Sequence, residues 1–518
     1  MKFFKAMATI GSWTMLSRLA GFLRDMLTAI IMGAGPLTDA FFVALKLPNF
    51  FRRITAEGAF SAAFVPVFSG KLAADGRQEA MGFARNAQAM MLTILLPFAA
   101  LIVVAMPLVV PLIAPGFVTE DNGRYDLAVE LARITFPYMV LISLVALLGG
   151  VMNAFDRFAP FAAMPLFFNL ALIAALLYAA AGGETASPAH AMAWGVLAAG
   201  VMQLLWMMFQ SLRAGAFVGL ARPRMTPEMK KTFALMGPGI LGAGIAQINL
   251  FIDMILASFL PAGAISYLYY ADRLYQFPLS IIGISIGVAL LPMLARAIKS
   301  ENHGEGQRLF SQALSAGALL ALPAAAGLAM LAAPIISALF EYGKFTAEDT
   351  LMSARALQAY ALALPAFIAV KIFSAASFAA EDTKTPVRYA IIGSLVNIVF
   401  SILLLIPLGH VGIALATAIG AWVNALLLAR KIVQQNPAAI WTKSETRQML
   451  SLLMCTAAMT AVLAAALHLD AAALFPATAF GKITHMFALV FAGMAVYFSA
   501  AFFTGNMRYL KELFRKSA

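Results

Sequence analysis

The sequence predicts an all-α polytopic membrane protein with about 14 transmembrane helices, built as two six-helix lobes related by a parallel repeat plus two C-terminal helices. Three observations predict this class. Of 518 residues, 62% are hydrophobic and only 12% are charged. The mean hydropathy is +0.87. Landmark residues recur at a nearly constant offset of 226 to 228 positions. Such a composition excludes a water-soluble core and indicates a chain whose solvent is a bilayer.

The individual helices are predicted from apolar runs of about 20 residues, each ended by turn residues or clustered charge. The expected spans are 8–33, 37–58, 82–106, 128–152, 159–181, 189–212, 232–258, 264–294, 309–338, 352–378, 386–407, 411–432, 447–467 and 482–504.

The loops between these spans alternate in charge. Segments 52–85 and 211–231 are rich in lysine and arginine, whereas 33–38, 182–189 and 258–265 contain neither residue. Because basic loops stay on the cytoplasmic side, both termini are expected in the cytoplasm. An even number of spans agrees with this orientation.

The repeat divides the chain into three predicted parts. Its landmarks are Gly11 with Gly237, Lys46 with Arg273, Pro66 with Pro292, Gly116 with Gly343, Pro160 with Pro386, and Asn169 with Asn397. We expect an N-terminal lobe at 1–228 (helices 1–6), a C-terminal lobe at 229–435 (helices 7–12), and helices 13–14 at 436–518. Two lobes of this kind predict alternating access, with the substrate near the midplane between the repeats.

Charged residues in the first span indicate a polar cavity. Arg18 lies ten residues into the span, or about 15 Å into a core of about 30 Å. A central arginine costs about 2.5–3.5 kcal/mol on insertion scales, so a wet cavity or a ligand is expected beside it. Ser17, Arg24 and Asp25 share its helical stripe.

Further cations lie at similar depth in other spans. In span two, Asp39, Lys46 and Arg53 form one stripe at helical spacing, with Arg52 beside it. In span eight, Arg273 occupies the position that the repeat pairs with Lys46. Cations outnumber carboxylates in this set, and guanidinium groups suit phosphate geometry, so an anionic ligand such as a diphosphate is predicted.

Simpler interpretations stand beside these assignments. Arg52 and Arg53 end span two on the cytoplasmic side, where ordinary membrane anchors also lie. Arg24 and Asp25 could neutralise each other near the outer interface. Lys371, late in span ten, is expected to extend to the inner interface.

Several other classes of function are excluded by the pattern. The basic residues lie in short loops rather than on one face, so no nucleic-acid binding is expected. The single cysteine, Cys455, supports no disulfide or zinc site, and the five histidines are scattered.

Three stretches carry a family resemblance: GSWTMLSRLAGFLRD at 11–25, GAGPLTDAFFVALKLPNFFRRITAEGAFSAAFVPVF at 33–68, and YYADRLYQFP at 269–278. They resemble the signature stretches of the bacterial lipid II flippases, the MurJ (MviN) family of the multidrug/oligosaccharidyl-lipid/polysaccharide (MOP) exporter superfamily. The resemblance implies a multi-pass transporter of the bacterial cytoplasmic (inner) membrane that acts in cell-wall biosynthesis. Its substrate would be lipid II, the undecaprenyl-diphosphate-linked precursor of peptidoglycan, moved from the cytoplasmic to the periplasmic leaflet.

The resemblance also implies roles for individual residues. Together with the depth argument, it gives the expected substrate-binding set Arg18, Arg24, Asp25, Asp39, Arg52, Arg273, Ser17 and Lys46. Possible sodium ligands are Asp253, Asn397 and Thr417, with Ser401 where a second carboxylate would help. Some members have a glutamate at the position of Gln276. Spans 13 and 14 are expected to form an apolar groove for the lipid tail.

No cofactor is expected, and coupling to sodium or to the membrane potential is possible. Membrane lipids and the cell-wall synthesis machinery are the expected partners.

Three alternatives remain open at this point. The substrate could be another undecaprenyl-diphosphate-linked glycan. A MATE-like drug/cation antiporter would be expected to present carboxylates rather than arginines. A membrane glycosyltransferase would be an enzyme with catalytic carboxylates or a metal site, and the longest outer segment, 107–127, contains no such constellation.

Overall fold

The computed structural model describes residues 2–53, 60–119, 123–182, 187–300, 302–435, 443–469, 475–476 and 478–507. Every regular element in these ranges is helical. The elements are α1 (Lys2–Met32), α2 (Pro36–Phe51), α3 (Ser61–Ala74), α4 (Gly76–Val104), α5 (Met106–Ile113), α6 (Gly116–Thr119), α7 (Arg124–Thr135), α8 (Tyr138–Ala154), α9 (Ala159–Ala162), α10 (Met164–Ala181), α11 (Pro188–Arg213), α12 (Pro227–Ser258), α13 (Ala264–Pro278), the π-helical turn η3 (Leu279–Ile284), α14 (Ser285–Lys299), α15 (His303–Met330), α16 (Ala332–Phe340), α17 (Ala347–Ala361), α18 (Leu364–Ala379), α19 (Lys384–Leu408), α20 (His410–Gln435), α21 (Lys443–His468) and α22 (Ala479–Phe503).

Local sequence explains where many of these helices begin. Proline occupies the first turn of α2, α11 and α12, where its missing N–H is not needed. Thr346 and Asp349 form a reciprocal capping box at the start of α17. These signals explain why polar and proline residues interrupt the apolar runs at the helix ends.

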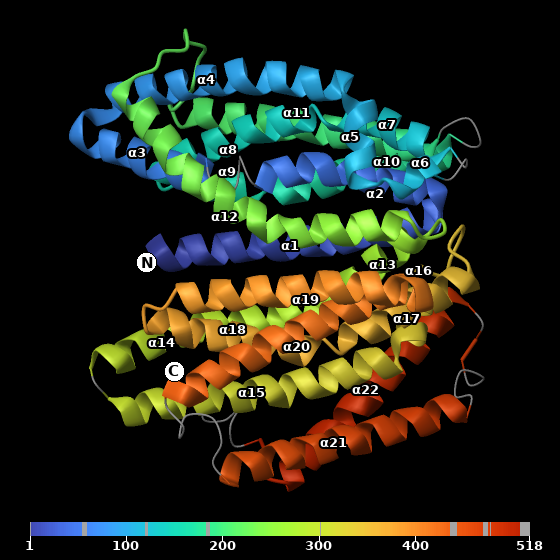
Figure 1. Ribbon diagram of the computed structural model, residues 1–518. Helices are drawn as coiled ribbons and strands as arrows, with labels where there is room; N and C mark the ends of the chain where they lie inside the picture. The colour runs from blue at the N-terminus through green and yellow to red at the C-terminus, as the bar shows by residue number, and fades with distance from the viewer. Residues whose placement is uncertain are drawn as a thin grey trace. The chain divides into compact units, whose positions relative to one another are not determined.

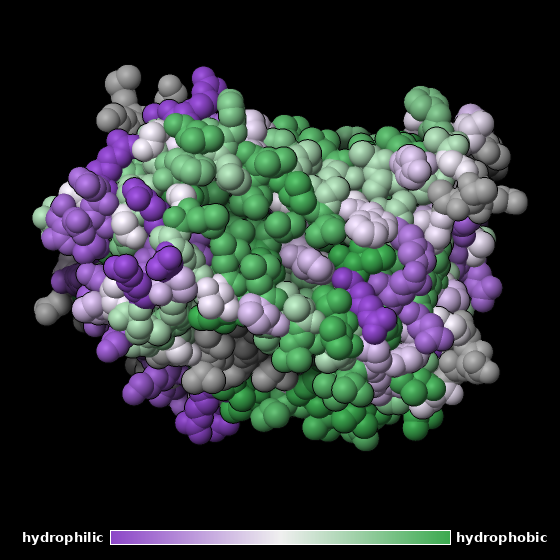
Figure 2. Space-filling model, turned by 90° about the horizontal axis from the view of Figure 1, so that it is seen from above, coloured by the Kyte–Doolittle hydropathy of each residue, from purple (hydrophilic) through white to green (hydrophobic). Residues whose placement is uncertain are grey.

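Eleven helical segments in the described ranges are long and apolar enough to cross a membrane. They coincide with predicted spans three to six and eight to fourteen. The other three predicted ranges contain α1, α2 and α12, and the end of the second, residues 54–58, lies outside the described residues. The surface in Figure 2 has a broad hydrophobic area with hydrophilic side chains gathered toward two ends. The prediction of an all-helical, multi-pass membrane protein is confirmed, whereas the total of fourteen spans stays a prediction.

The structure contains short helices within segments that hydropathy assigns to loops. Helix α3 lies in the basic segment 52–85, and α5 and α6 lie between residues 106 and 119, at the segment that was expected to face outward. Each is shorter than the 20 residues that a membrane crossing requires, so span counting does not detect them. Pro48 lies inside α2, and the backbone becomes π-helical at Arg52 and Arg53, one turn later.

The described helices form two compact units. The first comprises Met1–Ser266 with Tyr342–Phe345, and the second comprises Tyr267–Glu341 with Thr346–Ala518. Within each unit the long helices lie side by side (Figure 1). In the first unit α1 packs against α10, and α2 against α7. In the second, α19 packs against α20, and α14 against α18. The boundaries at 228 and 435 that the repeat suggests stay predictions.

Two close backbone contacts in the first unit join the two sequence repeats. The N–H of Gly116 donates to Ser258 Oγ at 3.0 Å, and a Cβ on Gly116 would lie 2.1 Å from the Ser258 carbonyl oxygen. A Cβ on Gly343 would lie 2.3 Å from the Ile30 carbonyl oxygen. The glycines are 227 positions apart, and Ile30 and Ser258 are 228 apart. Each repeat therefore presents its glycine to the end of the other repeat's first helix.

Candidate functional site

A polar cluster joins α1 to α10 in the first unit. Arg24 Nη2 lies 2.6 Å from Asp25 Oδ1, and Arg24 Nη1 donates to Asn169 Oδ1 at 2.9 Å. The amide nitrogen of Asn169 donates to the Ser17 carbonyl oxygen at 2.9 Å and to Ser17 Oγ at 3.3 Å. The structure thus brings together Ser17, Arg24 and Asp25, three of the predicted residues that share the helical stripe of Arg18.

Asn169 is a member of this cluster that sequence reasoning did not select. It is buried, 7% exposed, in the otherwise largely apolar helix α10. The sequence marks it only as a landmark of the repeat. The available signal was its polarity, because a hydrogen-bonding side chain inside a membrane helix usually faces a partner.

The other predicted cations of the first unit lie at different exposures. Arg18 is exposed on α1, and Lys46 and Arg52 are partly buried at the far end of α2. Arg18 lies on α1, which also carries Ser17, Arg24 and Asp25, whereas Lys46 lies on α2 and Arg52 directly follows it. Their contact with substrate stays a prediction.

Asp39 lies in a separate, fully buried position. Its carboxylate accepts hydrogen bonds from the N–H groups of Gly263, at 2.7 Å, and Ser266, at 2.9 Å, and from Ser266 Oγ at 2.6 Å. These groups lie at the start of α13, where unpaired N–H groups and the helix dipole favour an anion. The described bonds of Asp39 therefore fix the first turn of α13, and its predicted substrate contact is not tested by them.

Arg124 supplies a positive charge close to this carboxylate. Its Nη1 lies 3.8 Å from Asp39 Oδ2, and both side chains are fully buried. The guanidinium also lies over the ring of Phe117, with 4.6 Å to the centroid, and donates to the Leu260 carbonyl at 3.4 Å. Burial of this pair is tolerated because each charge has several polar or aromatic partners.

Arg273 is exposed on α13 in the second unit. Its guanidinium lies 4.7 Å from the centroid of the Tyr269 ring, and Nη2 contacts Tyr269 Oη at 3.1 Å. One turn further, Gln276 donates a hydrogen bond to Asp272. The π-helical turn η3 follows directly, and such turns occur often at functional sites. The exposed guanidinium provides the positive surface that an anionic ligand requires.

Two of the predicted sodium ligands contact each other between α19 and α20. Asn397 Nδ2 donates to Thr417 Oγ1 at 3.0 Å. Asn397 Oδ1 and Ser401 Oγ are buried and have no hydrogen-bond partner among the described residues. Such oxygens suit a hard monovalent cation, because a buried acceptor without a donor is costly. Asp253 lies on α12, in the first unit. Among the described residues no three His, Cys, Asp or Glu side chains could jointly hold a metal ion.

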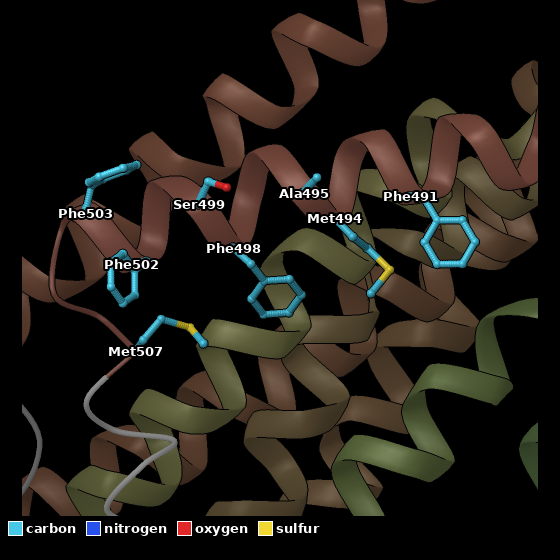
Figure 3. Close-up of a pocket in the computed structure, with 8 residues that line it drawn as sticks. All are labelled: Phe491, Met494, Ala495, Phe498, Ser499, Phe502, Phe503 and Met507. Carbon is cyan, nitrogen blue, oxygen red and sulfur yellow. The ribbon is translucent and has the colours of Figure 1, made fainter.

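An apolar groove of about 540 Å³ lies along α22. Figure 3 shows Phe491, Met494, Phe498 and Phe502 pointing to the same side of this helix, with Met507 below them. Its lining is aromatic and aliphatic with a single hydroxyl, from Ser499. A hydrocarbon chain is the ligand that such a surface fits.

Comparison with known proteins gives consistent matches. Residues 28–485 match the family model described as "Lipid II flippase MurJ". A protein of Rhizobium meliloti (strain 1021) named "Probable lipid II flippase MurJ" is 39% identical over 513 residues, which is 98% of this chain and 95% of that protein.

Two solved structures share the fold. The structure named "Lipid II flippase MurJ, inward closed conformation" has a TM-score of 0.78 and 26% identity, and the match covers 98% of this chain and 99% of that one. A multidrug resistance MATE family transporter of the MOP superfamily has a TM-score of 0.68 at 16% identity, covering 81% of this chain and 95% of that one. The second likeness shows a shared fold alone. On the family match and the relative's identity along nearly its whole length, this chain belongs to the lipid II flippase MurJ family.

Proposed function

We propose that this protein moves lipid II from the cytoplasmic to the periplasmic leaflet of the bacterial inner membrane, as a step of peptidoglycan synthesis. The observation that supports this most strongly is the family match over residues 28–485. The cationic residues on its membrane helices agree with a diphosphate-bearing substrate. The protein is a transporter, so no covalent chemistry is assigned to it.

The substrate head is bound by cations from both repeats in this proposal. The cations of the first repeat are Arg18, Lys46 and Arg52, and the cation of the second repeat is Arg273. Guanidinium groups pair with diphosphate oxygens, and the sugars and peptide occupy the wet cavity. The predicted set also contains Ser17, Arg24, Asp25 and Asp39, whose described hydrogen bonds are made to protein groups.

The proposed architecture has fourteen spans, with α1, α2 and α12 added to the eleven apolar segments, and both termini in the cytoplasm. Six helices form each lobe, at 1–228 and 229–435. The last two, at 436–518, hold the lipid tail, and the groove on α22 supports this assignment. Rocking of the lobes would expose the head to either side while the tail stays in lipid.

Energy coupling is a further part of the proposal. Sodium bound by Asp253, Asn397 and Thr417 is one source, and the unsatisfied oxygen of Asn397 supports it. The membrane potential is the other, because an inside-negative potential drives a negatively charged head outward. Enzymes of the cell-wall synthesis machinery are the proposed partners.

The decisive experiment measures the fraction of lipid II accessible from the periplasmic face of cells depleted of their own flippase. The wild-type chain should restore access, and Arg18→Ala/Arg273→Ala should fail although it reaches the membrane in normal amount. Arg222→Ala, which removes an exposed arginine from the loop before α12, is the matched control and should restore access. Lys371→Ala should also be tolerated.

If the wild-type chain reaches the membrane and access is not restored, the lipid II assignment is wrong. Another undecaprenyl-diphosphate-linked glycan is then the substrate to test. Normal access with Arg18→Ala/Arg273→Ala would instead contradict the cationic site while leaving the substrate intact.

A further inference from the structure

Arg24 is held by two oxygen ligands of the kind that bind cations. Its guanidinium contacts the Asp25 carboxylate oxygen at 2.6 Å and the Asn169 amide oxygen at 2.9 Å. Its side chain is only 11% exposed. Carboxylate and amide oxygens at this distance would equally suit a monovalent metal ion.

The orientation of Asn169 is fixed independently of Arg24. Its amide nitrogen donates to the carbonyl and hydroxyl oxygens of Ser17, so its oxygen must face the other way, toward Arg24. Gly21 permits the close approach of α1 to α10, because a Cβ there would lie 3.2 Å from Asn169 Nδ2. Contacts other than the one with Arg24 therefore hold the Asn169 oxygen in its position.

The second repeat contains the same acid and amide without the arginine. The matches at an offset of 228 are Asp25-Met26 with Asp253-Met254, Ala34-Gly35 with Ala262-Gly263, and Asn169 with Asn397. At this offset Arg24 corresponds to Ile252, which carries no charge.

The hydrogen bonding of Asn169 and Asn397 differs as expected from the presence of arginine in one repeat and isoleucine in the other. The amide oxygen of Asn169 accepts a hydrogen bond from Arg24. The amide oxygen of Asn397 is buried and lacks a hydrogen-bond partner within the described ranges. The repeat that has the arginine satisfies its asparagine, and the repeat that lacks it leaves an acceptor oxygen unsatisfied.

We propose that Asp25 and Asn169 form a monovalent-cation site whose permanent occupant is the guanidinium of Arg24. Arg24 then holds α1 against α10 as a tethered cation. Removing the Arg24 side chain opens the site to a free cation. A small guanidinium ion is the ligand that matches it best, because it restores the same donors.

The test is the thermal stability of the purified full-length protein in detergent, with guanidinium chloride added at low millimolar concentration and ionic strength held constant with choline chloride. Arg24→Ala should have a lower Tm than the wild type, and guanidinium should raise it saturably. The wild type should not respond. Sodium chloride in place of guanidinium chloride should raise the Tm of Arg24→Ala by a smaller amount. This comparison is made in an Asn397→Ala background, so that sodium binding at Asn397 in the second repeat does not contribute.

Two matched variants separate a cation site from a general stabilising effect. Arg24→Ala/Asn169→Ala lacks one ligand and should lose the response to guanidinium, whereas Arg273→Ala, which removes an exposed arginine elsewhere, should show none.

The proposal is overturned if Arg24→Ala ignores guanidinium, or if Arg24→Ala/Asn169→Ala responds as strongly as Arg24→Ala. This measurement uses no lipid substrate. Its failure therefore leaves the proposed transport of lipid II untouched, and failure of the transport assay would not affect the cation site.

Discussion

At the scale of single residues, the charges buried in the first unit are neutralised by neighbouring protein groups. Arg124 is 1% exposed and Asp39 is fully buried, and their charged groups lie 3.8 Å apart. Removing one member of such a pair leaves the other charge in a medium that solvates it poorly. The energetic cost of a substitution is therefore set by the charge that remains.

Arg124→Ala should destabilise the protein strongly, by about 3–5 kcal/mol, which is the usual cost of breaking a buried ion pair. The measurement is the unfolding midpoint in detergent. Arg133→Ala is the control, because this arginine lies on the same helix but is exposed and donates to a single carbonyl. A similar loss for both substitutions would contradict the role of the buried pair.

Residue-level chemistry was predicted from the sequence only in part. Depth selects Arg18, and helical spacing adds Arg24 and Asp39, because a charge inside an apolar run needs a partner. Neither identifies the partners, since Asp39 bonds to Gly263 and Ser266, more than 220 positions away along the chain. Asn169 was missed for the same reason, as its role depends on how α10 packs against α1.

At the scale of helices, an ion pair links α3 to α12. Lys71 Nζ lies 3.0 Å from Glu228 Oε1. The backbone N–H of Glu228 at the start of α12, together with Lys71 and Thr226, lowers the pKa of the Glu228 carboxyl to about 2. The charged form of Glu228 is thus favoured by folding.

The stability of the wild type should therefore fall as the pH decreases. A lowered pKa stabilises the folded state above the ordinary value of 4.5, and this contribution is lost as the pH falls from there toward about 2. Glu228→Gln should show a smaller decrease in unfolding midpoint between pH 6 and pH 3. Glu79→Gln, at an exposed position in the first turn of α4, is the control. Equal pH profiles for Glu228→Gln and the wild type would exclude this linkage.

Contact between the repeats gives a second prediction at this scale. Gly116→Ala should lower the unfolding midpoint, because its new Cβ would lie 2.1 Å from a backbone carbonyl that cannot rotate away. Gly82→Ala is the matched control in the same unit, since a Cβ there meets nothing within 4 Å. It should be neutral or stabilising by up to about 1 kcal/mol, as expected for glycine inside a helix. If Gly116→Ala and Gly82→Ala had the same unfolding midpoint, the close contact of Gly116 would not exist in the folded protein.

Helix positions were largely predictable, because membrane helices are defined by length and hydropathy alone. The expected spans 189–212 and 386–407 compare with Pro188–Arg213 and Lys384–Leu408. Helix α3 was missed, since it is too short to span a bilayer and lies among basic residues. The breaks within spans, such as η3 after α13, depend on packing that periodicity does not report.

At the scale of the whole molecule, transport should respond to the membrane potential. Moving one net negative charge outward is favoured by about 2.3 kcal/mol per 100 mV of inside-negative potential. In proteoliposomes with a potassium diffusion potential, lipid II should reach the outer leaflet faster at about −100 mV than at zero, as this coupling predicts. A rate that ignores the potential but follows the sodium gradient, and loses that dependence in Asn397→Ala, would assign the coupling to sodium instead.

The reciprocal contacts of Gly116 with Ser258 and of Gly343 with Ile30 bear on how the chain arose. The glycine of each repeat contacts the end of the other repeat's first helix. In a single repeat on its own, neither the glycine nor the end of the first helix would have this contact. Two identical copies related by a two-fold axis would make both contacts at once, as in any isologous homodimer. These reciprocal contacts are what the fusion of two copies of one ancestral subunit would leave in a single chain.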